Sequence, residues 1–244
     1  MQASAEILAS VFLEIRKLVR PGVTTLEIDE AVETMIREAG GIPSFKGYHG
    51  FPASACISVN EEVVHGIPSR RKLAAGDIVG IDIGLISDGW HADSAETVGV
   101  GEIGEEAAKL LRVTQECLAL GIETIAPGRR ISVIGTAIEN HARANGFSVV
   151  ESLVGHGIGR DLHEDPQVPN FRCFTMPDPV MQEGLVVAIE PMINCGTKRV
   201  VTAADDWTVL TADRRLSAHF EHTVAVTLEG PRILTRRGSG VAAL

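Results

Sequence analysis

A weak internal repeat divides this chain into two related halves and limits the folds that it can adopt. The segment that begins at Pro21 aligns without gaps to the segment that begins at Pro127, with seven identities in twenty positions. Each copy predicts a Pro-Gly turn followed by a helix that ends at a glycine, Gly40 in the first copy and Gly146 in the second. The repeat therefore predicts a fold with internal pseudo-symmetry.

Helical and β-rich segments occur in blocks. An amphipathic helix over 5–19 precedes the first copy of the repeat, and a helical stretch over 105–125 precedes the second. The β-rich segments that follow the two copies are 55–59, 76–84, 90–100, 185–190 and 219–228. Runs of helices followed by runs of strands favour an α+β fold. Since no Pro- or Ser-rich linker divides the halves, we expect one compact domain with a ligand cleft between them.

Charge and composition exclude several function classes. A net charge of −10 predicts no direct nucleic-acid binding, which needs a basic surface. No stretch reaches the ~20 apolar residues of a membrane span, and charged residues interrupt the first apolar run, which argues against a signal peptide. The four cysteines form no CxxC pair. Free thiols together with the lack of an export signal indicate a reducing cytoplasm, and the lack of a long apolar stretch predicts no membrane contact.

The segment around Asp82 and Asp93 predicts two carboxylates on one face of a hairpin. Asp88-Gly89 is a typical two-residue hairpin turn, and it places Gly84 opposite Asp93. Asp82 then projects from the same face as Asp93, at a diagonal separation of roughly 7–8 Å. Adjacent carboxylates repel each other, so one protonates unless a cation lies between them. The alternative is a solvated outer face, against which the apolar residues of the hairpin argue.

Three further metal-type side chains lie in other parts of the chain. His156 lies in a glycine-rich segment that lets the backbone approach a site closely, and His163 follows seven residues later. Glu190 ends a run of β-forming residues and Glu221 lies inside one, where a buried carboxylate needs a partner. Taken singly, His156 also suits a structural histidine, and Glu221 also suits a charge on an edge strand. Together with the aspartate pair, they form the set of four carboxylates and one imidazole that suits two divalent cations, and so predict a two-metal hydrolase.

Taken in order, these motifs closely resemble those of the type I methionine aminopeptidases. The matching segments extend nearly end to end and include VRPGVTTLEID, YHGFPASACISVNEEVVHGIP, GDIVGIDIG, DGWHADSAET, VGHGIGRDLHE, GLVVAIEPM and SAHFEHTVAV. The resemblance implies a pita-bread fold, in which two pseudo-symmetric helix-helix-strand halves surround a central curved antiparallel sheet. It also implies one metallopeptidase domain over 1–244, similar to the short bacterial form.

The resemblance assigns roles to individual residues. It implies that the metal ligands are Asp82, Asp93, His156, Glu190 and Glu221. It implies that His65 contacts the scissile amide nitrogen and that His163 stabilises the developing oxyanion. Glu190 would take a proton from a metal-bridging water and pass it to the leaving amine.

The implied substrate pocket is largely apolar. Its residues are Tyr48, Phe51, Cys56, His65, His163 and Trp207. From the residues alone, ordinary core packing would be the simpler explanation of its apolar members. Three positions depart from the family pattern and alter the pocket's shape while keeping it apolar: Phe51 stands where Tyr is common, Phe45 where Cys is common and Leu162 where Phe is common.

The implied activity is removal of the N-terminal methionine from nascent proteins and peptides. The implied cofactors are two divalent ions (Co, Mn, Fe or Zn) and a monovalent cation. The expected substrates are peptides and nascent chains with an N-terminal methionine. Transient association with the ribosome and a monomeric state are also expected. Two alternatives remain: a proline-specific aminopeptidase or dipeptidase, which usually carries an extra N-terminal domain, and a non-catalytic binding protein of the same fold.

Overall fold

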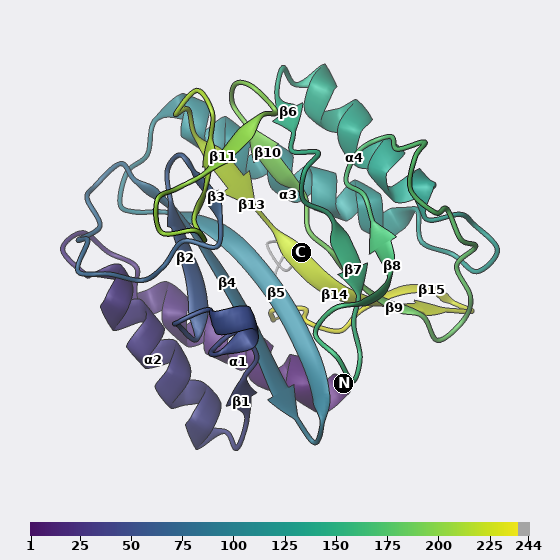
Figure 1. The fold of residues 1–244 in the computed structure, drawn as a ribbon, viewed down its shortest axis with the longest axis horizontal. Helices are drawn as coiled ribbons and strands as arrows, with labels where there is room; N and C mark the ends of the chain where they lie inside the picture. Colours follow the sequence, from purple (N-terminus) through teal and green to yellow (C-terminus); the bar gives the residue numbers. More distant parts are fainter. Residues whose placement is uncertain (239–244) are drawn as a thin grey trace.

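The computed structural model describes residues 1–238, in which four α-helices pack against one face of a strongly curved sheet (Figure 1). The elements of the first half are α1 (Gln2–Leu18), α2 (Thr25–Glu38), β1 (Ile42–Pro43), the short 3-10 helix η1 (Tyr48–Gly50), β2 (Ala55–Val59), β3 (Glu62–Val64), β4 (Ile78–Ser87) and β5 (Trp90–Gly99). The second half begins with α3 (Glu105–Glu123), α4 (Ser132–Ala144), β6 (Ser148–Val149), β7 (Gly155–Gly157), β8 (Glu164–Val168), β9 (Val186–Ile189) and β10 (Met192–Asn194). It continues with β11 (Val200–Thr202), β12 (Val209–Thr211), β13 (Ser217–His219), β14 (Glu221–Thr227) and β15 (Gly230–Ile233).

One antiparallel sheet joins strands from both halves. Its order is β1-β4-β5-β14-β9-β7-β8, with β2 paired to β4 and β15 paired to β14. Two smaller sheets, β13-β10-β6 and β11-β12-β3, flank it. The helix pairs α1/α2 and α3/α4 lie at opposite ends of the sheet (Figure 1). The α+β prediction is confirmed. None of the helices in the described part of the chain is long and apolar enough to cross a bilayer.

Each helix pair forms a core with its own part of the sheet. In α1, the buried side chains of Leu8, Phe12 and Ile15 recur at helical spacing. They pack in one cluster with Ile81 and Ile83 of β4, and burial of each such side chain contributes about 1.5–3 kcal/mol. In the second half, α3 and α4 pack in the same way against β9 and β14. Because side chains alternate along a strand, the even-numbered residues of β4 project from the other face of the sheet.

The backbone repeats the same turn in both halves. The Gly22 N–H donates to the Leu73 carbonyl at 2.8 Å, and the Gly128 N–H donates to the Met181 carbonyl at 2.9 Å. Both glycines have left-handed φ angles, +91° and +86°, which residues with a Cβ rarely adopt. An isolated antiparallel bridge follows two residues later in each copy. The pseudo-symmetry predicted from the repeat is therefore confirmed.

Candidate metal centre

The register of the sheet brings Asp82, Glu221 and Glu190 to one face. Asp82 of β4 lies opposite Ala95 of β5, and Ala95 in turn lies opposite Glu221 of β14. Directly paired residues project from the same face, so the two carboxylates point the same way across a small residue. Glu190 directly follows Ile189, which pairs with the residue after Glu221. Three carboxylates from three strands thus converge.

Asp93 and His156 occupy the neighbouring row on the same face. Gly84 lies opposite Asp93, as the Asp-Gly turn predicts. His156 of β7 and Thr223 of β14 both pair with Ala188 of β9. The Thr223 hydroxyl donates to the Asp93 carbonyl at 2.7 Å. The rows also contain the small residues Gly84, Ala95 and Ala188, which leave space around the carboxylates and His156.

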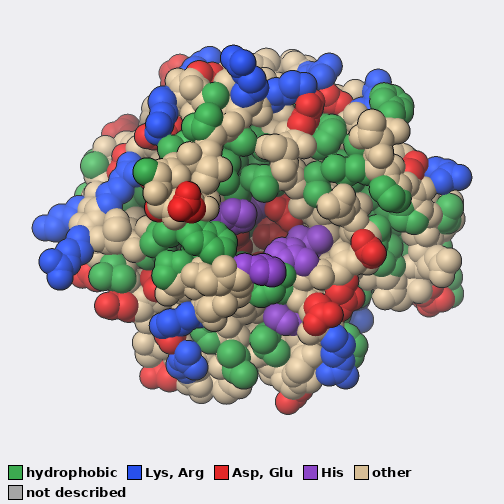
Figure 2. All heavy atoms as spheres, in the orientation of Figure 1, with side chains coloured by type: hydrophobic (Ala, Val, Ile, Leu, Met, Phe, Trp, Pro, Cys, Tyr) green, Lys and Arg blue, Asp and Glu red, His purple; other side chains and the backbone are tan. Residues whose placement is uncertain are grey.

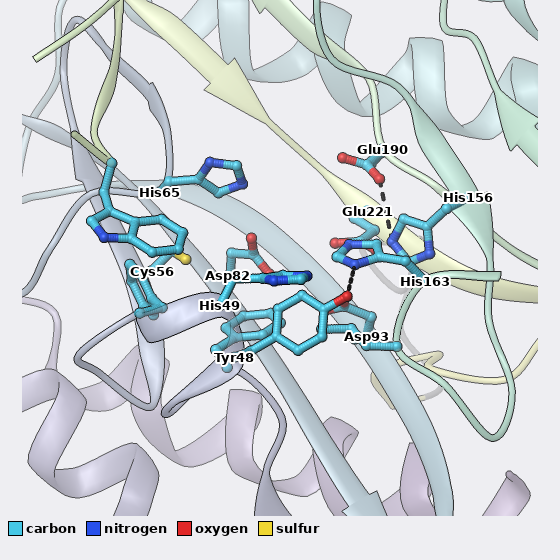
Figure 3. A pocket seen from close by; sticks show the side chains of 14 residues that line it. Tyr48, His49, Cys56, His65, Asp82, Asp93, His156, His163, Glu190 and Glu221 are labelled. Atoms are coloured by element: carbon cyan, nitrogen blue, oxygen red, sulfur yellow. Dashed lines mark hydrogen bonds and ion pairs between the residues drawn. The ribbon is translucent and has the colours of Figure 1, made fainter.

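All five side chains line one cavity of about 250 Å³. Figure 2 shows it as a hollow with carboxylates at its floor and histidines at its rim. The six predicted substrate-binding residues line the same cavity. In the view of Figure 3, Asp82 lies between His65 and the ring of Tyr48. The structure thus brings every predicted site residue to one place, while their individual roles stay predictions.

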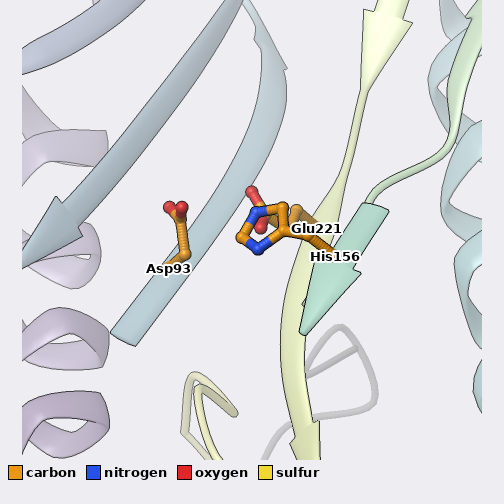
Figure 4. Close-up of side chains that lie close together, drawn as sticks. All are labelled: Asp93, His156 and Glu221. Carbon is orange, nitrogen blue, oxygen red and sulfur yellow. The ribbon is translucent and has the colours of Figure 1, made fainter. Parts of the chain in front are cut away.

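The donor atoms fit a metal ion. Ligand-type atoms of Asp93, His156 and Glu221 lie within 4.8 Å of one another (Figure 4). One buried oxygen on each of Asp82, Asp93 and Glu221 has no hydrogen-bond partner within residues 1–238. An unpaired buried carboxylate costs several kcal/mol unless a cation or a proton neutralises it. Divalent cations bound between these oxygens would remove that penalty.

The carboxylates of the cluster have raised pKa values. Burial raises the pKa of Asp93 to about 7. Burial, together with the charges of neighbouring carboxylates, raises the pKa of Asp82, Glu190 and Glu221 well above the ordinary range. Without a cation, the cluster therefore holds protons at neutral pH. A bound divalent cation reverses this effect, because it stabilises the ionised form of each group.

His156 is prepared to offer a lone pair to a metal. Its Nδ1 donates to the Gly157 carbonyl at 2.8 Å, so the neutral ring carries its lone pair on Nε2. Nε2 lies 3.6 Å from Glu190 Oε1. Burial lowers the pKa of His156 to about 4, which keeps the ring neutral under physiological conditions.

Two further histidines, His65 and His163, line the cavity beside the carboxylate cluster. The ring of His163 packs edge-on against that of His156, with centroids 4.3 Å apart. The backbone of His65 has a φ of 59°, a strained conformation of the kind that is frequent at functional sites. Burial lowers the pKa of both His65 and His163. Both rings are therefore neutral hydrogen-bonding groups at the edge of the cavity.

The rest of the cavity is mostly apolar. Phe51 and Trp207 pack edge-to-face with centroids 5.1 Å apart, and Cys56 lies opposite Asp82 in the sheet. Phe45 lies over Gly84, where an added Cβ would come within 2.6 Å of the phenyl ring. A glycine at that position therefore lets an aromatic side chain approach the strand that carries Asp82.

Comparisons with known proteins decide the family. The model of metallopeptidase family M24 matches residues 1–228. This chain belongs to family M24.

The M24 chain is similar to several methionine aminopeptidases along nearly its whole length. It is 51% identical to the methionine aminopeptidase of Clostridium perfringens, over 96% of this chain and 94% of the relative. It is 49% identical to methionine aminopeptidase 1 of Bacillus subtilis, over 97% and 95%.

Solved structures share the fold. The methionine aminopeptidase of Rickettsia prowazekii superimposes with a TM-score of 0.94 at 38% identity, covering 96% of this chain and 95% of the other. The prolidase of Pyrococcus furiosus gives a TM-score of 0.78 at 20% identity, over 98% of this chain and 63% of the prolidase, and shares the fold alone. The predicted pita-bread fold is confirmed.

One histidine that lines the cavity was not predicted from the sequence. His49 lines the M24 site, but a single histidine in a glycine-containing loop carries no pattern that predicts this position. Two other histidines, His219 and His222, are buried. His222 bonds Thr235, with Nδ1 and Oγ1 2.8 Å apart, whereas His219 Nε2 is buried without a partner among the described residues.

Proposed function

We propose that this M24 metallopeptidase removes the methionine from the N-terminus of peptides and nascent proteins. The observation that carries the proposal is the convergence of four carboxylates and one imidazole at the base of a largely apolar cavity. High identity to two methionine aminopeptidases supports the choice of substrate.

Asp82, Asp93, His156, Glu190 and Glu221 would hold two divalent cations. Oxygen-rich donor sets with one imidazole suit Mn, Fe, Co or Zn. When bound, the cations supply Lewis-acid chemistry, which activates water near neutral pH and polarises a carbonyl. The resemblance adds a monovalent cation to the proposal.

The remaining steps fall to side chains of the chain itself. Glu190 serves as the general base that accepts a proton from the attacking water and returns it to the leaving amine. His163 donates a hydrogen bond to the carbonyl oxygen as negative charge develops there. His65, on the other side of the cavity, contacts the scissile amide nitrogen. Phe51, Cys56 and Trp207 enclose the methionine thioether and exclude water.

The proposal extends to the domain organisation, the oligomeric state and the location of the enzyme. We propose a single catalytic domain over 1–244 that acts as a monomer in the cytoplasm, where its four free thiols would remain reduced. Transient association with the ribosome would bring it to nascent chains. Its contribution is then to protein maturation.

Peptide hydrolysis after chelation and re-addition of single metals tests the function. The peptide Met-Gly-Met-Met should be cleaved only after metal is restored, and Leu-Gly-Met-Met more weakly, since an apolar pocket discriminates by only about 1–3 kcal/mol. Glu221→Gln should lose the activity, while Glu229→Gln, at an exposed turn after the same strand, should keep it. Cleavage of Xaa-Pro peptides in place of Met-Gly would indicate a proline-specific enzyme. Metal binding without any hydrolysis would indicate a binding protein.

A further inference from the structure

The segment 234–237, which follows β15, packs on the face of the sheet opposite the cavity. Its backbone joins β14, because the Leu234 N–H donates to the Thr223 carbonyl at 2.9 Å. The Thr235 hydroxyl accepts from the Thr223 N–H at 3.1 Å and lies 2.8 Å from Nδ1 of His222. This segment therefore lies directly behind the strand that begins at Glu221.

Arg237 is buried in this segment although it is charged. Its residue exposure is only 5%. Its guanidinium stacks on the ring of Phe12 at 3.8 Å. Nη1 lies 3.3 Å from Oε2 of Glu96, and Nη2 donates to the Ser94 hydroxyl at 2.6 Å. Burying a guanidinium costs several kcal/mol before such partners compensate, so the buried position of Arg237 depends on its contacts with Ser94 and Glu96.

The contacts of Arg237 reach the backbone of two acidic residues in the cavity. Ser94, which accepts from Arg237, donates through its own hydroxyl to the Glu221 carbonyl at 2.7 Å. Ser94 also directly follows Asp93 along β5. Two hydrogen bonds thus connect the guanidinium to the paired strands β5 and β14, here called the β5–β14 seam. Asp93 and Glu221 project from the opposite face of this seam.

A second arginine, Arg16, can be compared with Arg237. It also pairs with Glu96, but its side chain is 36% exposed. Its hydrogen bonds go to Glu96 and, within residues 1–238, reach neither Ser94 nor Glu221. Both arginines pair with Glu96, but only Arg237 also bonds Ser94 of the β5–β14 seam.

We propose that Arg237 is a positioning residue for the metal centre, which through Ser94 holds the β5–β14 seam so that Asp93 and Glu221 keep the spacing that two cations need. This inference rests on the proposed metal-dependent function. It assigns a role in metal affinity to a residue that touches neither metal nor substrate. Loss of groups that orient metal ligands typically lowers metal affinity about 10–100-fold.

Metal titration of purified variants tests the proposal. Mn²⁺ affinity, measured by calorimetry on metal-free protein, should fall about 10–100-fold in Arg237→Met. Co²⁺ absorption spectra should shift in the same variant, since they report ligand geometry. Arg236→Met, which changes the adjacent exposed arginine, should behave as wild type. Arg16→Met should lower the melting temperature without weakening Mn²⁺ binding.

Further variants separate positioning from general stabilisation. Ser94→Ala should weaken Mn²⁺ binding, and combining it with Arg237→Met should add little, because the two act through one path. Should Arg237→Met fail to fold, Ser94→Ala and Arg237→Lys provide the test. An Arg237→Met protein with lowered melting temperature but wild-type Mn²⁺ affinity and Co²⁺ spectrum would overturn the proposal. Wild-type protein that binds no divalent metal would instead overturn the proposed function.

Discussion

The hydroxyl of Tyr48 lies 2.7 Å from Nδ1 of His163, and this contact determines which nitrogen of His163 carries its proton. A phenol is the better donor of the two groups, so Nδ1 accepts and Nε2 keeps the hydrogen. Burial lowers the pKa of His163, so the ring has only this one N–H. By donating to Nδ1, Tyr48 keeps the proton of His163 on Nε2, and this Nε2–H is the donor that the proposed oxyanion role requires.

Tyr48→Phe should lower kcat with little change in KM. The phenyl ring keeps the apolar contacts, whereas the lost hydrogen bond contributes about 0.5–1.5 kcal/mol, equivalent to about 2–13-fold in rate. Steady-state kinetics on Met-Gly-Met-Met measure both constants. In a His163→Ala background the same change should have no further effect, and an equal loss there would show that Tyr48 does not act through His163.

His163→Ala itself should reduce kcat by about 10²–10³, the usual cost of losing an oxyanion donor. Metal content should remain at the wild-type level, because the five predicted ligands are unchanged. Measurements of kcat and bound metal on the same preparation separate the two effects. His49→Ala, another histidine of the cavity rim, serves as the control and should lose far less. A His163→Ala rate near that of wild type would remove the residue from the mechanism.

The raised pKa values in the cluster predict how the metal-free protein responds to pH. Burial raises the pKa of Asp93 to about 7, and burial with neighbouring charges raises that of Glu221. The folded state therefore holds protons that the unfolded chain releases above about pH 4. The contribution of these groups to stability is present below pH 4 and is lost as pH rises toward 7.

Comparison with Glu221→Gln isolates this contribution. Burial lowers the pKa of His156 to about 4, which favours folding as pH rises and opposes the trend of the carboxylates. In metal-free protein, the Tm of Glu221→Gln should exceed that of wild type by an amount that grows between pH 5 and 7.5. Each kcal/mol of charge repulsion removed should raise Tm by about 2–4 °C. Wild type, and not the variant, should regain stability with Mn²⁺. Thermal melts of chelated and reloaded samples measure this, and a pH-independent difference in Tm would contradict it.

Local sequence signals predicted most of the fold and the cluster. The turn at Asp88-Gly89 sets the β4–β5 register, because a two-residue turn leaves only one pairing of the flanking strands. The contact between Tyr48 and His163, and the burial of Arg237, depend on tertiary packing between distant segments. A single tyrosine in a loop or an arginine near the chain end carries no period or spacing, so neither could be predicted from the sequence.

The two halves of the repeat cap their second helices differently, which gives a matched test of stability. Thr24 forms a capping box with Glu27 at the start of α2. At the start of α4, Asp178 instead accepts from the Ser132 N–H at 2.9 Å and from its hydroxyl at 2.8 Å. Thr24→Ala and Asp178→Ala should each lower the free energy of unfolding by about 1 kcal/mol, while Thr24→Ser should change it by a few tenths. Urea denaturation measures this, with kcat expected to stay unchanged because both caps lie outside the cavity. Equal midpoints for Thr24→Ala and wild type would show that the packed core alone holds α2 in place.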